Sequence, residues 1–154
     1  MSIISPPSRL SCWNYRVKEV LRVVDGDTID VDIDLGFDLR IKQRVRVAGI
    51  DTPEKRTRNK EEKALGIDAT KWLEDKIADA FLEGQEITIR TEVDKGATGK
   101  YGRLLGWIYV DDVNISLNEQ MVAEGYAWIY DGGTKTKDLE QLREIRRNKG
   151  TLSI

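Results

Sequence analysis

Residues 29–47, IDVDIDLGFDLRIKQRVRV, contain two runs in which apolar residues occupy almost every second position. Acids fill the gaps in the first run, and cations fill them in the second. This period of two is typical of strands with one buried face, and residues 36–38 can reverse the chain between them. We predict paired strands in which acids lie opposite cations, each cross-strand pair contributing about 0.2–1 kcal/mol. Six charged side chains take this structural role: Asp30, Asp32, Asp34, Arg40, Lys42 and Arg44.

Short strands and amphipathic helices are expected around this pair. The further strands are predicted at residues 15–24, near 87–89 and at 104–110, and the helices at residues 60–82, 116–124 and 137–148. The second helix opens with Ser116 and Glu119 at capping-box spacing. About five strands with one long and two shorter helices indicate an α+β fold, mainly β, with helices against a small closed or partly open barrel.

Length and composition fit one globular domain. The chain has 154 residues, of which 40% are hydrophobic and 34% are charged. Residues 1–14 have the composition of a loose N-terminal extension, and we assign residues 15–154 to the domain. The chain has no apolar run of membrane-spanning length, and its N-terminus lacks the pattern of a signal peptide. We therefore expect no membrane association and an intracellular location.

The residue types that are missing limit the possible chemistry. The sequence contains no histidine, and Cys12 is its only cysteine. An internal disulfide, a zinc site built on histidine or thiolate clusters, and an imidazole base are thereby excluded. Carboxylates without these partners are hard oxygen donors, so a bound ion would be Ca²⁺ or Mg²⁺.

Two acids follow strand-like runs at positions that alternation assigns to the buried face. Asp27 shares the parity of Ile29, and Asp51 shares the parity of Val47 unless Gly49 inserts a bulge and breaks the count. Neighbouring carboxylates that lose their hydration must share protons or bind a cation. A hard divalent ion is the economical solution.

Residues 51–54, Asp-Thr-Pro-Glu, also have a purely structural interpretation. Thr52 could cap a helix whose first turn contains Pro53 and Glu54. The surrounding charge favours a functional one, because residues 40–60 hold eight Lys or Arg and only two acids, while the whole chain has a net charge of −2. A local excess of cations attracts phosphate groups.

An ion at these acids would give the nearby residues the roles that phosphodiester hydrolysis requires. Glu54 could hold or deprotonate a water beside the ion. The planar fork of arginine binds phosphate through two donors, which makes Arg46 and Arg103 candidates for clamping it. In the glycine-rich loop, Lys100 could contact a terminal phosphate and Tyr101 could stack on a base.

Three ordered motifs make the chain resemble the staphylococcal nuclease family from about residue 20 to residue 150: VDGDT (24–28), RVAGIDTPE (46–54) and KYGR (100–103). The resemblance implies a five-stranded OB-fold barrel with three helices packed on it. It also implies an endonuclease that uses one Ca²⁺ ion, rather than Mg²⁺, to hydrolyse DNA and RNA and leaves 3′-phosphate ends.

The resemblance implies a role for each motif residue. The expected calcium ligands are the carboxylates of Asp27 and Asp51 and the backbone carbonyl of Thr52. Glu54 would handle the attacking water, and Arg46 and Arg103 would clamp the phosphate. Lys100 and Tyr101 would bind the nucleotide. The expected substrates are single-stranded or unpaired DNA and RNA, and a monomer is favoured.

Other readings stay open at this point. Gly99 stands where many family members have an acid, and Tyr126, Trp128 and Tyr130 could serve either packing or base stacking. The alternative function is a catalytically silent OB-fold module that binds nucleic acid or a protein partner. A third alternative is a structural domain whose acids are solvated turn residues.

Overall fold

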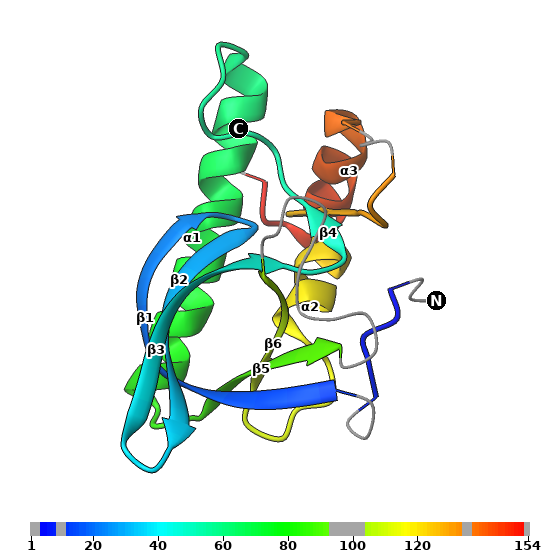
Figure 1. Cartoon of the computed structure of the whole chain (residues 1–154). Helices are drawn as coiled ribbons and strands as arrows, with labels where there is room; N and C mark the ends of the chain where they lie inside the picture. Colours follow the sequence, from blue (N-terminus) through cyan, green and yellow to red (C-terminus); the bar gives the residue numbers. More distant parts are fainter. Residues whose placement is uncertain (1–3, 9–11, 93–103, 134–136, 153–154) are drawn as a thin grey trace.

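The computed structural model describes residues 4–8, 12–92, 104–133 and 137–152 (Figure 1). Five strands form a closed barrel in the order β1-β2-β3-β6-β5, which confirms the predicted barrel. These strands are β1 (Cys12–Asp25), β2 (Thr28–Gly36), β3 (Leu39–Val47), β5 (Ile87–Glu92) and β6 (Leu104–Val110). Closure removes the open sheet edges on which other chains could pair.

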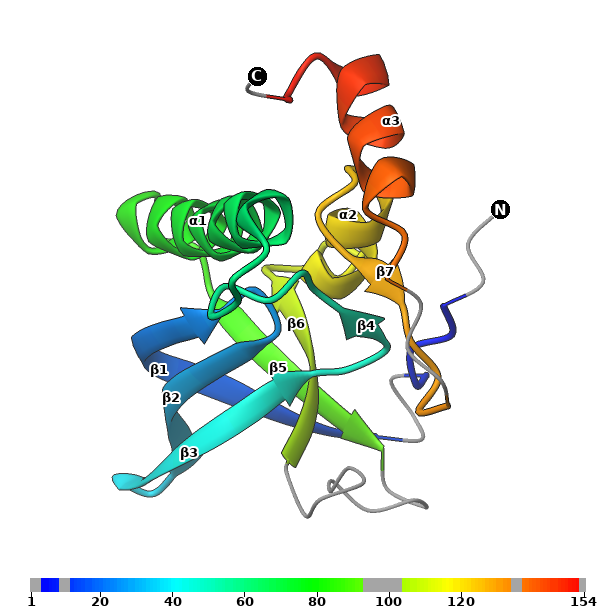
Figure 2. The same cartoon turned by 90° about the horizontal axis from the view of Figure 1, so that it is seen from above.

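The remaining elements lie outside the barrel. The helices are α1 (Lys60–Leu82), α2 (Leu117–Ala123) and α3 (Leu139–Lys149), and the short strands β4 (Ile50–Asp51) and β7 (Trp128–Ile129) form a separate two-stranded sheet. In Figure 2 all three helices lie on one side of the barrel, with α2 and α3 beside β7. The helix α1 buries Leu65, Ala69, Leu73 and Ile77 on one face, as its apolar pattern predicts.

The predicted pairing of acids with cations is present in the β2–β3 hairpin. Asp30 lies opposite Arg44, and the guanidinium donates from Nε and Nη2 to the carboxylate at 2.7 and 3.0 Å. Asp32 differs from the expectation of a solvated face, because it is only 4% exposed. It lies opposite Lys42, but its ion pair is with the diagonal neighbour Arg40, whose Nε is 3.6 Å from Oδ2.

The described N-terminal residues make contacts with the barrel. Strand β1 begins at Cys12 rather than at residue 15, because residues 12–16 pair with β5. Upstream, Ile4 is buried in the core, and Arg90 of β5 donates from Nη1 to the carbonyl of Pro7 at 3.2 Å. The described residues of the expected loose extension therefore lie against the barrel, through partners distant in sequence.

One buried side chain ties the barrel to α2. Asn118 is fully buried, and its Nδ2 donates to the carbonyls of Ala48 at 2.8 Å and Gly106 at 3.1 Å. Its Oδ1 accepts from the N–H of Ile108 at 2.9 Å. These bonds join α2 to the place where residues 45–47 of β3 pair in parallel with residues 104–106 of β6.

We expect Asn118→Ala to lower the free energy of unfolding by about 3 kcal/mol, because buried backbone groups then lose their partners. Urea unfolding followed by circular dichroism measures this change. The exposed Asn114 gives a matched control, and Asn114→Ala should change the free energy of unfolding by less than about 0.5 kcal/mol. Equal effects of the two substitutions would contradict the assigned role.

Candidate active site

The predicted acids meet at the end of the barrel where β2 starts and β3 ends. Arg46 lies opposite Thr28, and its Nη2 is 3.7 Å from Oδ2 of Asp27 and 3.6 Å from Oδ1 of Asp51. Arg46 is 6% exposed and Asp51 is 2% exposed. The structure therefore brings together two acids and one arginine that the sequence singles out, in a site largely shielded from water.

The other half of the Arg46 guanidinium is fixed by the backbone. Its Nη1 donates to the carbonyls of Val47 and Ile50, each at 3.1 Å. The ring of Tyr130 lies 5.8 Å from the guanidinium carbon, within range of a cation–π contact. Since the fork is planar and rigid, holding one nitrogen with carbonyls sets where the other nitrogen points.

Strand alternation is not what brings the acids together. Asp27 lies in the turn between β1 and β2, and its carbonyl accepts from the N–H of Val47 at 2.8 Å. Ala48 and Gly49 separate β3 from β4, and the φ of Gly49 is +77°, so the parity of Val47 does not carry over to Asp51. The turn itself delivers Asp51 to the site.

Gly49 is required in that turn for two reasons. A positive φ favours glycine, and a Cβ at this position would lie 2.7 Å from Cη2 of Trp107. After this turn, Asp51 of β4 pairs with Trp128 of β7.

Thr52 lies at the same carboxylates. It is 4% exposed, and its backbone N–H donates to Oδ2 of Asp27 at 3.4 Å. Four of the predicted site residues, Asp27, Arg46, Asp51 and Thr52, are therefore neighbours in space.

Asp25 is a member of this site that the sequence interpretation missed. Its Oδ1 accepts from the N–H of Asp27 at 3.4 Å. Burial, together with a hydrogen bond to Asp27 and repulsion by its charge, raises the pKa of Asp25 to about 6. The signal was available in the sequence, because Asp25 lies only two residues before Asp27, and a nearby like charge disfavours ionisation of a carboxyl group.

Asp27 shifts in the opposite direction. Burial disfavours its ionised form, but the charge of Arg46 and hydrogen bonds from neighbouring groups outweigh this effect and hold the pKa of Asp27 below its ordinary value. The environments of the two neighbouring acids thus shift their pKa values in opposite directions. The pKa of Asp27 lies below its ordinary value, and the pKa of Asp25 lies closer to neutrality.

Glu54 lies in the irregular segment that follows. Its side chain is exposed, and its backbone N–H donates to Oε2 of Glu62 at 3.2 Å. The helix α1 begins at Lys60, where the side chain of Asn59 caps it by accepting from the N–H groups of Glu61 and Glu62. The alternative in which Thr52 caps a helix at Pro53 is therefore wrong.

These acids have the chemistry that a hard divalent cation requires. The carboxylates of Asp27 and Asp51 converge on one guanidinium nitrogen, and Asp25 adds a third acid beside them, so negative charge is in excess. Among the described residues, no three acid, histidine or cysteine side chains form a complete metal-binding group. The donor set fits Ca²⁺ or Mg²⁺ only if backbone carbonyls, water or substrate complete the shell.

Three predicted site residues, Lys100, Tyr101 and Arg103, lie outside the described residues, as does Gly99. Their roles remain predictions. The next described residues, Leu104 and Leu105, lie opposite Val45 and Arg46 in the parallel pairing of β3 with β6.

The three aromatic residues near the C-terminal part separate into two groups. Tyr126 stacks on Trp72 with ring centroids 5.7 Å apart, and the buried Trp128 donates from Nε1 to the carbonyl of Asp138 at 3.0 Å. Both therefore have packing roles. The ring of Tyr130, by contrast, contacts a charged group of the site, the Arg46 guanidinium.

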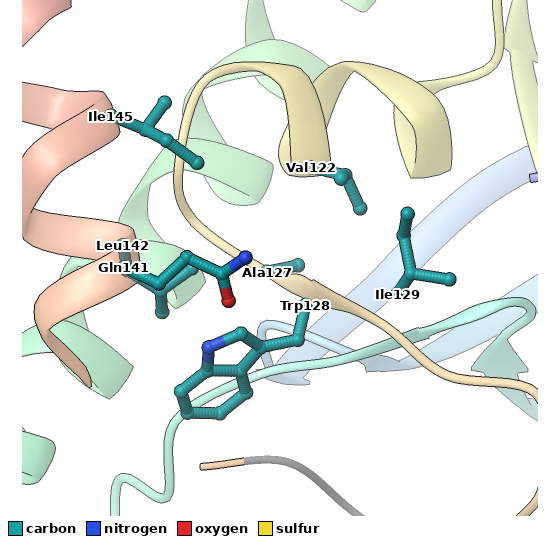
Figure 3. A pocket seen from close by; sticks show the side chains of 7 residues that line it. All are labelled: Val122, Ala127, Trp128, Ile129, Gln141, Leu142 and Ile145. Atoms are coloured by element: carbon teal, nitrogen blue, oxygen red, sulfur yellow. The ribbon is translucent and has the colours of Figure 1, made fainter. Parts of the chain in front are cut away.

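A pocket between α2, β7 and α3 is separate from these charged groups (Figure 3). Its lining is mostly apolar: Val122, Ala127, Trp128, Ile129, Gln141, Leu142 and Ile145. None of the predicted site residues lines it, so the charged cluster at the barrel end is the candidate active site.

The raised pKa of Asp25 predicts a pH-dependent effect of Asp25→Asn. In the folded state Asp25 ionises near pH 6, above its ordinary value, so ionisation destabilises the fold as pH rises through this range. Asparagine cannot ionise, so the variant should unfold at a higher temperature than wild type at about pH 8, and this gain should shrink toward about pH 4. Thermal unfolding with chelator present measures it, and a gain independent of pH would refute the stated cause.

The amino-acid sequence was compared with those of known proteins, and it matches one family. The model of the family described as "Staphylococcal nuclease homologue" matches residues 44–149. The Escherichia coli protein ParB is 34% identical over 145 residues, which cover 90% of this chain and 71% of that protein. A micrococcal nuclease from Shigella flexneri is 34% identical over 157 residues, or 96% and 76% of the two chains. A thermonuclease from Staphylococcus hyicus is 33% identical over 118 residues, or 77% and 62%. The chain belongs to the staphylococcal nuclease family.

Proposed function

We propose that this protein is a calcium-dependent endonuclease that hydrolyses phosphodiester bonds of DNA and RNA and leaves 3′-phosphate ends. The observation that carries the proposal is the convergence of Asp27 and Asp51 on Nη2 of Arg46, at 3.7 and 3.6 Å. Relatives named thermonuclease and micrococcal nuclease support the same reaction class.

The chain would hold the cation through the carboxylates of Asp27 and Asp51 and the carbonyl of Thr52. A bound divalent cation would offset the negative charge of the scissile phosphate and lower the pKa of a nearby water. Calcium suits the site better than magnesium, because it accepts a larger and less regular set of oxygen ligands.

Arg46 would bind a phosphate oxygen through Nη2, the nitrogen that faces the acids. Its Nη1 stays on the carbonyls of Val47 and Ile50, so Nη2 is the donor available for an incoming phosphate oxygen. Donors that are already oriented stabilise developing charge without a reorganisation cost. Arg103 is proposed as the second clamp on the same phosphate.

Glu54 would position or deprotonate the attacking water. Its side chain is exposed, so it can reach solvent, whereas Asp51, three residues earlier in the sequence, is 2% exposed. Proton transfer of this kind typically contributes about 10²–10⁴-fold in rate.

The proposed substrate is single-stranded or unpaired nucleic acid, bound by a monomer, with Lys100 and Tyr101 contacting the nucleotide. The exposed cations Arg56, Arg58 and Lys60 follow Glu54 and provide attraction for the phosphate backbone. Binding through such contacts releases counterions and weakens as salt rises. No helix within the described part of the chain is both long and apolar enough to cross a membrane.

Cleavage of a labelled single-stranded oligonucleotide tests the proposal. We expect cutting with Ca²⁺, little with Mg²⁺, none with chelator, and a loss of about 10²-fold or more in Glu54→Gln, because the amide cannot accept a proton. End-group analysis of the fragments should give 3′-phosphates. Tight binding with no cutting under any ion would instead support the silent binding module.

Calcium should also raise the midpoint of thermal unfolding of the wild type, since a ligand that binds only the folded state stabilises it, by about 2.7 kcal/mol at 100 times its Kd. Asp51→Asn should abolish this shift. Asp112→Asn removes an exposed turn acid and should retain it. An unchanged midpoint in the wild type would exclude a calcium site and favour a purely structural role for the acids.

A further inference from the structure

The segment that carries Glu54 lies directly against the N-terminal half of α1. At Gly66 of this helix, a Cβ would lie 2.7 Å from the carbonyl oxygen of Pro53. It would lie 2.8 Å from the carbonyl carbon of Glu54 and from the nitrogen of Lys55. The backbone of residues 53–55 therefore occupies the space that any larger residue at position 66 would fill.

A carboxylate one turn earlier on α1 holds the same segment by a hydrogen bond. Oε2 of Glu62 accepts from the N–H of Glu54 at 3.2 Å, and the Glu62 side chain is only 12% exposed. Nζ of Lys137, which precedes α3, lies 3.5 Å from the same oxygen. Asn59 fixes the turn by accepting from the N–H of Glu62 at 3.2 Å.

The opposite side of the segment is tied to the barrel. Nζ of Lys55 donates to the carbonyl of Val24 at 2.8 Å, next to Asp25. The peptide of Glu54 is thus held between α1 and the end of β1, while its own side chain stays exposed. A residue that must present its carboxylate at one place needs a fixed backbone and an exposed side chain.

We infer that Glu62 and Gly66 are positioning residues for Glu54, an inference that rests on the proposed function. Glu62 does not act on the substrate itself, because its Oε2 already accepts the Glu54 N–H and faces Lys137. It acts through the backbone of the neighbouring acid. A general base works only within hydrogen-bond reach of its proton, so loosening this backbone lowers the rate rather than substrate binding.

Glu61 provides a matched control in the same helical turn. Like Glu62 it is a first-turn acid tied to the C-terminal part, through an ion pair of 3.1 Å with Arg143 of α3. No hydrogen bond joins it to Glu54 within the described residues. Glu61→Ala removes the same charge and a similar link to α3 while leaving the Glu54 contact intact.

Amide hydrogen exchange, read residue by residue by NMR, tests the contact without any cleavage assay. We expect the Glu54 amide to exchange at least about tenfold faster in Glu62→Ala than in wild type, because the hydrogen bond that protects it is lost. Glu62→Gln retains a carbonyl acceptor and should keep most of the protection, and Glu61→Ala should keep all of it. Unchanged exchange at Glu54 in Glu62→Ala would overturn the inference.

Steady-state cleavage tests the catalytic consequence. We expect Glu62→Ala to lower kcat about tenfold with little change in KM, because the rate of proton transfer falls steeply when the base is slightly displaced. Glu62→Gln should recover most of the rate, and Glu61→Ala should match wild type. In a Glu54→Gln background, Glu62→Ala should have no further effect, because residues that act as a unit are not additive.

Gly66→Ala is a second, independent variant. Alanine favours the helix by about 1 kcal/mol over glycine, so α1 itself is not weakened. The added Cβ should displace residues 53–55, with a similar loss in kcat at an unchanged far-ultraviolet circular dichroism spectrum. Wild-type kcat in this variant would contradict the close approach.

The outcomes separate the two proposals. If Glu54→Gln is inactive and Glu62→Ala cleaves like wild type, the positioning role fails and the proposed nuclease stands. If Glu54→Gln cleaves like wild type, the role of Glu54 fails and the positioning role fails with it. Equal losses from Glu61→Ala and Glu62→Ala would assign both effects to α3 docking and overturn the inference.

Discussion

The buried guanidinium of Arg46 is the constraint on which the site and its surroundings depend. A charge this far from water is tolerated only if hydrogen bonds and opposite charges replace its hydration. Two carbonyls of the β3–β4 turn and two carboxylates supply that replacement. The β1–β2 turn, the end of β3 and β4 must therefore meet at one point, and the same interactions that make the fold possible also assemble the acids.

This arrangement couples stability to chemistry. Removing one partner of a buried ion pair leaves an uncompensated charge, which typically costs about 3–5 kcal/mol. Asp27 and Asp51 share one arginine, so the site tolerates neither the loss of Arg46 nor a rearrangement of the turn at Gly49. The pKa of Asp25 is raised first by burial and then by the hydrogen bond to Asp27 and by its charge, so a cation bound beside these acids would favour the ionised form of Asp25.

Much of the fold could be predicted, because the decisive patterns are local. Alternation in residues 29–47 predicted the hairpin with acids facing cations, and the apolar face of residues 60–82 predicted α1. The structure differs from these predictions where contacts between residues distant in sequence determine the local structure. Strand β1 extends back to Cys12 because it pairs there with β5. Asp32 is buried, and it forms its ion pair with the diagonal neighbour Arg40. Asp27 and Asp51 both lie near Arg46, but turns rather than strand parity bring them there. The parity argument did not include Asp25, and the contact of Glu62 with Glu54 could not be predicted, since no motif links residues 54 and 62.

The pairing of β4 with β7 has a consequence for how the protein is made. Asp25, Asp27, Arg46 and Asp51 are all translated within the first third of the chain, yet Asp51 pairs with Trp128, and the closing bonds of Asn118 come from α2. The strand partner of Asp51 is therefore synthesised more than 70 residues after Asp51 itself, so β4 can be completed only when most of the chain has been translated.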